Sequence, residues 1–350
     1  MQDRFGAAGR MRWGWFIAFA LVLVLLPLVT ETGTPTLLCI YALFALSLGL
    51  MWGFAGILSF GHAAYFGLGA YTYAITSMNA GESTAALLLA MLIPAFVAAT
   101  IGAMMFYGRI SDVYMGVITL VVTLILFKFM NQTAGDAYRI GSARLGGFNG
   151  IPAFPILNVP GDPSMTIFGT PFYYFSIVCL LGCYLLSRWI LYSSFGRVLI
   201  GIRENEARAE LLGYNAPAYK TAIFTITAAM AGLAGCLFAN WAEIVTPTVF
   251  SLGQSAEVII WVVAGGLGTL IGPMLGAAAL GMLKLLLGTQ TLIDNSLVLG
   301  IILILVVLLV PRGIAPAFAA WRERSSQAGI SRQAMGGTRR RRRGSAAESK

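Results

Sequence analysis

The stretch AALLLAMLIPAFVAATIGAMMFY, residues 85–107, decides the fold, because it runs for 23 residues without a charged side chain. An α-helix rises about 1.5 Å per residue, so this stretch is long enough to cross the ~30 Å hydrocarbon core of a bilayer. The whole chain has the same character: 58% of its residues are hydrophobic, only 11% are charged, and its mean hydropathy is +0.81. A soluble domain is nearer a quarter charged. The sequence therefore predicts an all-α protein embedded in the membrane.

Apolar segments of this kind recur along almost the whole chain, which leaves no room for a sizeable soluble domain. Ten of them approach the length of a crossing: residues 13–29, 36–54, 61–77, 85–107, 113–131, 172–192, 221–240, 257–270, 272–288 and 297–310. The eighth segment is short enough that the region 241–270 could be a full crossing or a broken, re-entrant helix. We therefore expect a polytopic transmembrane helical bundle of about ten helices.

The positions of the basic residues predict the orientation, because cytoplasmic loops are enriched in Lys and Arg. Counting in alternation from a cytoplasmic N-terminus places the following residues inside: Arg4, Arg10, Arg12, Arg109, Arg197, Arg203, Arg208, Lys220 and Arg312. The exterior loops then hold only Arg139 and Arg144. Both ends of the chain are expected in the cytoplasm.

The C-terminal segment 326–350 differs from the rest, since five consecutive arginines, 339–343, are flanked by small and polar residues. This composition predicts a disordered basic cytoplasmic tail close to anionic membrane lipid. The net charge of +9 does not point to nucleic acid, because the basic residues lie mainly at the ends and between the apolar segments. Contact of the tail with RNA is the weaker alternative.

Two connections are longer than simple turns. The exterior one, 132–165, is rich in Gly and Pro and predicts an ordered but irregular surface. The cytoplasmic one, 193–219, reads SSFGRVLIGIRENEARAELLGYNAPAY and contains a charged helical stretch, 203–212, that should end at Gly213. We expect it to form a short surface helix.

No catalytic, cofactor-binding or metal-binding constellation is expected. The chain has a single histidine, His62, without a matching nucleophile or carboxylate, and its four cysteines lie inside apolar segments. A GxxxxGK[ST] nucleotide-binding sequence is absent. The chain is therefore predicted not to be an enzyme, which leaves transport, channel activity or scaffolding.

The candidate pathway residues are Ser59, Gly61, His62 and Lys284. The first three belong to GFAGILSFGHAAYFGLGAY, residues 53–71, which mixes helical runs with glycine and polar side chains. Such a segment is either a helix break that lines a cavity at membrane depth or a tight turn at the cytoplasmic interface. Lys284 lies inside the ninth apolar segment, and it faces either the protein interior or a membrane interface.

Three sequence stretches, in order, carry a resemblance to a known family. LSFGHAAYFGLGAYTYA (58–74), FGRVLIGIRENEARAELLGYNAPAYK (195–220) and SLGQSAEVIIWVVAGGLGTLIGPMLGA (251–277) resemble the permease subunits of branched-chain amino acid ABC importers, in their LivM-like branch. The resemblance covers most of residues 36–312.

The resemblance implies a multi-pass protein of the bacterial inner membrane. We expect its permease domain to span residues 1–325 and to work by alternating access. Its implied partners are a second, LivH-like permease, two ABC ATPase subunits and a periplasmic substrate-binding protein. In the family the cytoplasmic loop, here 193–219, supplies the coupling helix. The residues in that place are Arg203, Glu204, Asn205, Glu206, Ala207, Arg208, Glu210 and Gly213.

The substrate and the class of protein have alternatives. Similar permeases serve leucine, isoleucine and valine, other amino acids, or urea and short amides. An ATP-independent channel or secondary transporter would need ionisable residues deep in several spans, and Lys128 and Lys284 are few for that role. A membrane scaffold is the third alternative.

Overall fold

The computed structural model describes residues 31–135, 137–160 and 162–288, together with Val24, Pro27 and Gly300. Apart from these three residues, the predicted apolar segments 13–29 and 297–310 lie outside the described residues, and so does the basic tail. The described helices are α2 (Gly33–Leu50), α3 (His62–Ala80), α4 (Ser83–Tyr107), α5 (Asp112–Gln132), α6 (Thr170–Tyr192), α7 (Ser194–Glu204), α8 (Glu206–Leu211), α9 (Ala216–Ala242), α10 (Leu252–Gly265) and α11 (Ile271–Gly288).

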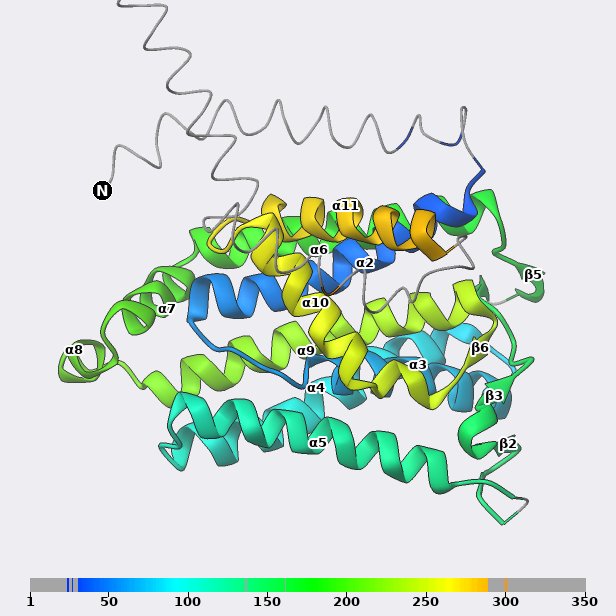
Figure 1. Cartoon of the computed structure of the whole chain (residues 1–350), viewed down its shortest axis with the longest axis horizontal. Coiled ribbons are helices and arrows are strands. Elements are labelled where there is room, and N and C mark those ends of the chain that lie inside the picture. Colours follow the sequence, from blue (N-terminus) through cyan, green and yellow to red (C-terminus); the bar gives the residue numbers. More distant parts are fainter. Residues whose placement is uncertain are drawn as a thin grey trace, which may run out of the picture.

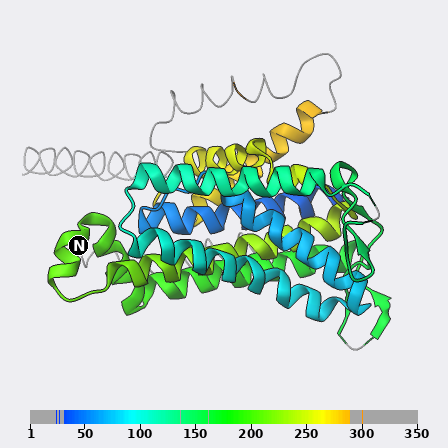
Figure 2. The same ribbon diagram turned by 90° about the horizontal axis from the view of Figure 1, so that it is seen from below.

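The long helices lie side by side along the longest axis of the molecule (Figure 1). Helices α7 and α8 project at one end and the short strands gather at the other, as both views show (Figures 1 and 2). We refer to these as the α7–α8 end and the strand end.

Within the described residues, five helical stretches are long and apolar enough to cross a membrane: Gly33–Ala55, Ser83–Tyr107, Asp112–Gln132, Thr170–Tyr192 and Ala216–Ala242. Their bounds agree with the predicted segments to within a few residues, because the length of an apolar run determines where a crossing helix can end. Helices α10 and α11 are apolar but shorter, and α3 belongs to neither group. The protein is therefore a multi-pass helical membrane protein.

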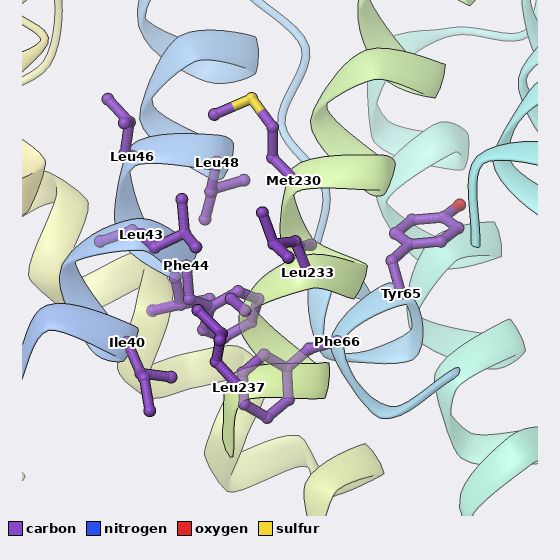
Figure 3. Packing of buried hydrophobic residues seen from close by; sticks show 14 of the residues in the cluster. Ile40, Leu43, Phe44, Leu46, Leu48, Tyr65, Phe66, Met230, Leu233 and Leu237 are labelled. Carbon is purple, nitrogen blue, oxygen red and sulfur yellow. The ribbon is translucent and has the colours of Figure 1, made fainter. Parts of the chain in front are cut away.

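The core lies between α2, α3 and α9. Phe44, Phe66 and Leu237 point toward one another there (Figure 3), and the rings of Phe44 and Phe66 are 4.6 Å apart. The apolar window of α2 is 83% buried, whereas that of α4 is only 22% buried. Helix α2 is thus the centre of the bundle, and the exposed apolar side chains of α4 are typical of a lipid-facing surface.

Small residues let α3 and α9 approach closely. A Cβ atom at Gly69 would lie 2.1 Å from the carbonyl oxygen of Gly232, and one at Gly235 would lie 1.8 Å from that of Phe66. Both positions exclude a side chain, since such distances are far inside van der Waals contact. The four-residue spacing of Ala231, Gly235 and Ala239 is therefore a packing feature, as membrane helices commonly use it.

Three short antiparallel strand pairs form the strand end. They join β1 (Arg139–Ile140) to β2 (Ala143–Arg144), β3 (Ile151–Pro152) to β6 (Ile244–Val245), and β4 (Asn158–Val159) to β5 (Asp162–Thr166). Side-chain hydrogen bonds fasten this loop to the bundle: the backbone N–H of Leu157 donates to Asn240 Oδ1 at 2.7 Å, and that of Ser83 donates to Asn158 Oδ1 at 3.0 Å. The long connection is ordered and irregular as predicted, with short strand pairs that the sequence did not indicate.

The predicted single helix over 203–212 is wrong, because the chain breaks at Asn205. This residue is extended, with φ −159° and ψ 100°, and its Oδ1 accepts a hydrogen bond from the N–H of Arg208 at 2.9 Å. An asparagine in this conformation ends one helix and caps the next. The result is two helices, α7 and α8; the second ends at Leu211, two residues before Gly213, whose φ is +89°.

Candidate functional site

The chain between α2 and α3 is unwound inside the bundle. Helix α2 continues as a π-helix, η2 (Met51–Ala55), and ends at Gly56, whose φ is +75°. Residues 56–59 then form no regular structure, and α3 begins only at His62. Gly61 packs against Thr119 and Thr123, in the middle of α5. The segment 56–61 therefore runs from the α7–α8 end back to the middle of α5, with Gly56 and Phe60 exposed and Ser59 and Gly61 buried.

Three of the predicted pathway residues, Ser59, Gly61 and His62, meet at this break. Ser59 is fully buried, and its Oγ accepts a hydrogen bond from the N–H of Gly61 at 3.3 Å. The carbonyl of Gly61 accepts one from Thr123 Oγ1 at 3.0 Å. Backbone groups freed by an unwound segment need such partners, because no water reaches them in a membrane core.

His62 occupies the first turn of α3 and is 1% exposed. Its Nε2 lies 2.7 Å from Ser47 Oγ, and the ring stacks on Phe44 with centroids 5.5 Å apart. The Ser47 hydroxyl donates to the carbonyl of Phe44 at 2.7 Å, so it accepts from the imidazole, whose Nε2 then carries the proton. Nδ1 is left as an acceptor with no hydrogen-bond partner among the described residues. A buried polar atom without a hydrogen-bond partner is uncommon in folded proteins, so this nitrogen is a candidate for a functional role.

Lys284, the fourth candidate, lies apart from the other three. Its Nζ is 2.7 and 2.8 Å from the two carboxylate oxygens of Glu257, and this ion pair joins α11 to α10. Gly281, one turn earlier, packs against Leu38 and Tyr41 in the half of α2 near the strand end, whereas His62 contacts Ser47 in the other half. The structure thus separates Lys284 from the break at His62.

A second interruption follows α9. The chain leaves strand β6, forms the 3₁₀ turn η4 (Pro247–Phe250) and enters α10 at Leu252. Phe250 stacks on Tyr71 of α3 at 5.5 Å and lies where a Cβ of Gly67 would be. With 14 residues, α10 is only about 21 Å long, shorter than the hydrocarbon core. The geometry matches the broken-helix alternative for the region 241–270.

Helices α7 and α8 and the turn after them carry the residues that the resemblance assigns to coupling, and three of their side chains, those of Arg203, Glu206 and Glu210, bond to other parts of the chain. Glu206 pairs with Lys220 at the start of α9 at 2.6 Å, and Glu210 pairs with Arg109 in the α4–α5 connection at 3.3 Å. The guanidinium of Arg203 donates to the carbonyl of Gly53 in η2. Arg208 is exposed and has no ion pair with a described residue. The α7–α8 unit is therefore attached to three separate parts of the bundle.

Two residues that the sequence analysis did not single out stand at the tip of this unit. The side chains of Leu211 and Leu212 are among the most exposed large apolar groups of the described residues, at 89% and 71%. They follow a charged helix and precede Gly213, outside the long apolar segments. The sequence feature that could have identified them is an apolar pair in a polar loop, directly before a glycine. Exposed apolar groups of this kind commonly mark a protein contact.

Comparisons with known proteins agree on one family. The family model described as "Branched-chain amino acid transport system / permease component" matches residues 32–309. The high-affinity branched-chain amino acid transport system permease protein LivM of Escherichia coli (strain K12) is 28% identical over 330 residues, which cover 86% of this chain and 74% of that protein. LivM of Salmonella typhimurium is also 28% identical, over 325 residues.

A second type of permease matches over a shorter region. The permease protein LivH of the same transport system in Escherichia coli (strain K12) is 34% identical over 140 residues, which cover 39% of this chain and 45% of that protein. No solved structure matches the chain.

Proposed function

Because the chain belongs to the family of branched-chain amino acid transport permeases, we propose that it is the LivM-like membrane-spanning subunit of an ABC importer for leucine, isoleucine and valine. The observation that carries this proposal is the family match over residues 32–309, which includes both interrupted elements and the α7–α8 unit. The relatives are transport permeases, so we assign the ATP chemistry to separate subunits and no catalytic residue to this chain.

We propose a topology of about ten helices in the bacterial inner membrane, with both ends of the chain and the α7–α8 end in the cytoplasm. The charges of the described residues support this orientation: Arg109, Arg208 and Lys220 lie at the α7–α8 end, whereas Arg139 and Arg144 lie at the strand end. Residues 1–325 form the permease domain in this proposal, and residues 326–350 form a basic tail next to anionic lipid.

The proposed assembly contains a second, LivH-like permease, two cytoplasmic ABC ATPases and a periplasmic binding protein. The matches to both LivM and LivH support a pair of related permeases. We assign the ATPase contact to the tip of the α7–α8 unit, where Leu211 and Leu212 are exposed near Arg208, which forms no ion pair with a described residue. A small apolar anchor with a charged rim suits a specific, reversible contact.

The proposed mechanism is alternating access. Closure of the ATPases on ATP moves the α7–α8 unit, and its ion pairs to Arg109 and Lys220 carry that movement to the α4–α5 connection and to α9. The transport path passes the interrupted segment with Ser59, Gly61 and His62, because an unwound segment in a membrane bundle is retained where it borders a path. Lys284, paired with Glu257, is a second candidate nearer the strand end.

Uptake by the reconstituted transporter tests the proposal. We expect proteoliposomes that contain this chain with its partner permease and ATPases, supplied with the binding protein, to take up leucine only with ATP. The matched control replaces the nucleotide-binding lysine of the ATPases and should abolish uptake. Uptake by this chain alone without ATP would show a channel or secondary transporter instead, and uptake of urea or short amides in preference to leucine would overturn the substrate.

A further inference from the structure

Arg203 lies near the end of α7, in the exposed loop, but its side chain bonds to the membrane bundle. Its Nη1 donates a hydrogen bond to the carbonyl oxygen of Gly53, within the π-helix η2. The last carbonyl groups of a helix lack partners within that helix and carry partial negative charge. A guanidinium from another element therefore caps the end of η2 and attaches α7 to it.

The stem of the same side chain lies over the first residue of the unwound segment. A Cβ atom at Gly56 would be 2.9 Å from Cγ of Arg203, and the φ of Gly56 is +75°, a conformation that glycine adopts without strain. Arg203 thus contacts η2 at Gly53 with its head group, and the first residue of the unwound segment, Gly56, with its stem.

The other end of the unwound segment is anchored in the interior. Gly61 is bonded to Thr123 of α5, and His62 is bonded to Ser47 of α2. Between these anchors and Gly56 the chain forms no helix or strand, so no ladder of backbone hydrogen bonds holds its shape. The stretch between Gly56 and these anchors can therefore change its shape when its Gly56 end is displaced.

Helices α7 and α8 share a small core with the start of α9. Ile202 of α7, Ala209 of α8 and Ala216 of α9 form a small buried cluster separate from the main core. This cluster holds the two helices together and to the start of α9. Helix α7 also contacts η2, which directly precedes the unwound segment.

We propose that Arg203 is a positioning residue that couples the α7–α8 unit to the unwound segment 56–61, so that displacement of the unit changes the shape of this segment at Ser59, between Gly56 and the anchored start of α3. This assignment rests on the proposed function, and it changes the part that Arg203 plays: its guanidinium acts on the membrane bundle and not on the ATPase. Helix α7 then works as a lever between a docking tip and the interrupted part of the path.

The test compares Arg203→Gln, Arg203→Lys and Arg197→Gln in the complete reconstituted transporter. Arg197 is the matched control, because it lies on the same helix but, among the described residues, bonds only to the end of α6, at Tyr192 O, and to the start of α7, at Ser194 Oγ. Loss of a charge-assisted hydrogen bond corresponds to about tenfold or more in a coupled equilibrium. We expect Arg203→Gln to lower ATP-dependent uptake by about tenfold or more, with assembly and basal ATP hydrolysis kept, Arg203→Lys to recover part of the uptake, and Arg197→Gln to change none of these.

A second measurement reads the segment itself. Ser59→Cys, in a chain whose four native cysteines are replaced by alanine, reports access of a hydrophilic maleimide to this buried position. With Arg203 present, trapping the ATPases on ATP should change the labelling rate, and with Arg203→Gln the rate should be the same in both states.

The outcomes separate the inference from the proposed function. Uptake and labelling by Arg203→Gln equal to those of the parent protein would overturn the inference while leaving the transporter assignment intact. Joint loss of assembly, ATP hydrolysis and uptake would show a purely structural anchor and would also overturn it. Absence of ATP-dependent uptake by the parent protein is a failure of the proposed function.

Discussion

The Oγ of Ser47 on α2 lies 2.7 Å from Nε2 of His62, so the two helices on either side of the unwound segment are bonded to each other at the point where α3 begins. Both side chains are buried, with 0% and 1% of their surface exposed. The bond closes a loop whose backbone has few other partners, and it determines the depth at which α3 starts.

Ser47→Ala should destabilise the protein by about 1–3 kcal/mol, because Nε2 of His62 would become a buried donor without an acceptor. Thermal unfolding in detergent, followed by the loss of monodisperse protein, measures the change. Ser142→Ala is the control, since the exposed Ser142 also makes side-chain hydrogen bonds, to Met78 and Asn79. An unchanged melting temperature for Ser47→Ala would mean that the bond to His62 is not needed.

Gly235→Ala should prevent close packing of α3 and α9, because the added Cβ would lie 1.8 Å from the carbonyl oxygen of Phe66. Overpacking of this kind costs about 1–3 kcal/mol or more, since backbone and not a flexible side chain must move. The yield of folded protein and its melting temperature report the effect. Gly182→Ala is the matched control: it adds the same methyl group in α6, where nothing lies within 4 Å, and should be neutral or stabilising.

Lys284→Met should leave the carboxylate of Glu257 without its partner in a half-buried position. We expect a loss of about 1–3 kcal/mol, below the 3–5 kcal/mol typical of fully buried pairs. The double variant Glu257→Gln with Lys284→Met should recover the melting temperature, since no charge is then left alone. If Lys284 lies on the transport path, the double variant remains defective in uptake. Normal uptake by this stable double variant would limit Lys284 to a structural role.

Leu211→Ser combined with Leu212→Ser should weaken binding of the ATPase subunits, because an exposed apolar pair that is buried on docking contributes about 1 kcal/mol or more per side chain. Co-purification of the ATPases with the tagged permease pair measures the loss. Tyr138→Ser is the control, as it removes an exposed apolar group at the opposite, strand end. Equal loss of ATPase from both variants would argue against docking at the tip.

The spans and the site differ in how well they could be predicted. The apolar stretch 85–107 predicted α4, Ser83–Tyr107, almost to its ends, because a crossing helix is defined by length and composition alone. The break at Asn205 was missed, since asparagine is compatible with a helix interior until its side chain is seen to cap the next turn. Leu211 and Leu212 were not predicted as a contact site, because the sequence does not show whether two apolar residues in a loop are buried or exposed.

The grouping of Ser59, Gly61 and His62 was predicted, because they are close in sequence on one glycine-rich segment. The sequence did not decide between a tight turn and an unwound segment, since both have the same composition. Its depth was decided by contacts with distant residues, such as Thr123 of α5 and Ser47 of α2. Likewise, Lys284 was recognised as an unusual charge, but its partner Glu257 lies 27 residues away and was found only in the fold.

The sequence by itself determined that this chain is a helical membrane protein, because burying long apolar stretches in a bilayer depends on composition and not on which partner they meet. It also determined the family, through motifs that are contiguous in the chain. Only the tertiary structure decided that α3 starts inside the bundle, that Arg203 turns back to the bundle and bonds to Gly53, and that the α7–α8 unit presents Leu211 and Leu212. The reason is that hydrogen bonds and close contacts between distant residues require their helices to be side by side, and no local pattern specifies that arrangement.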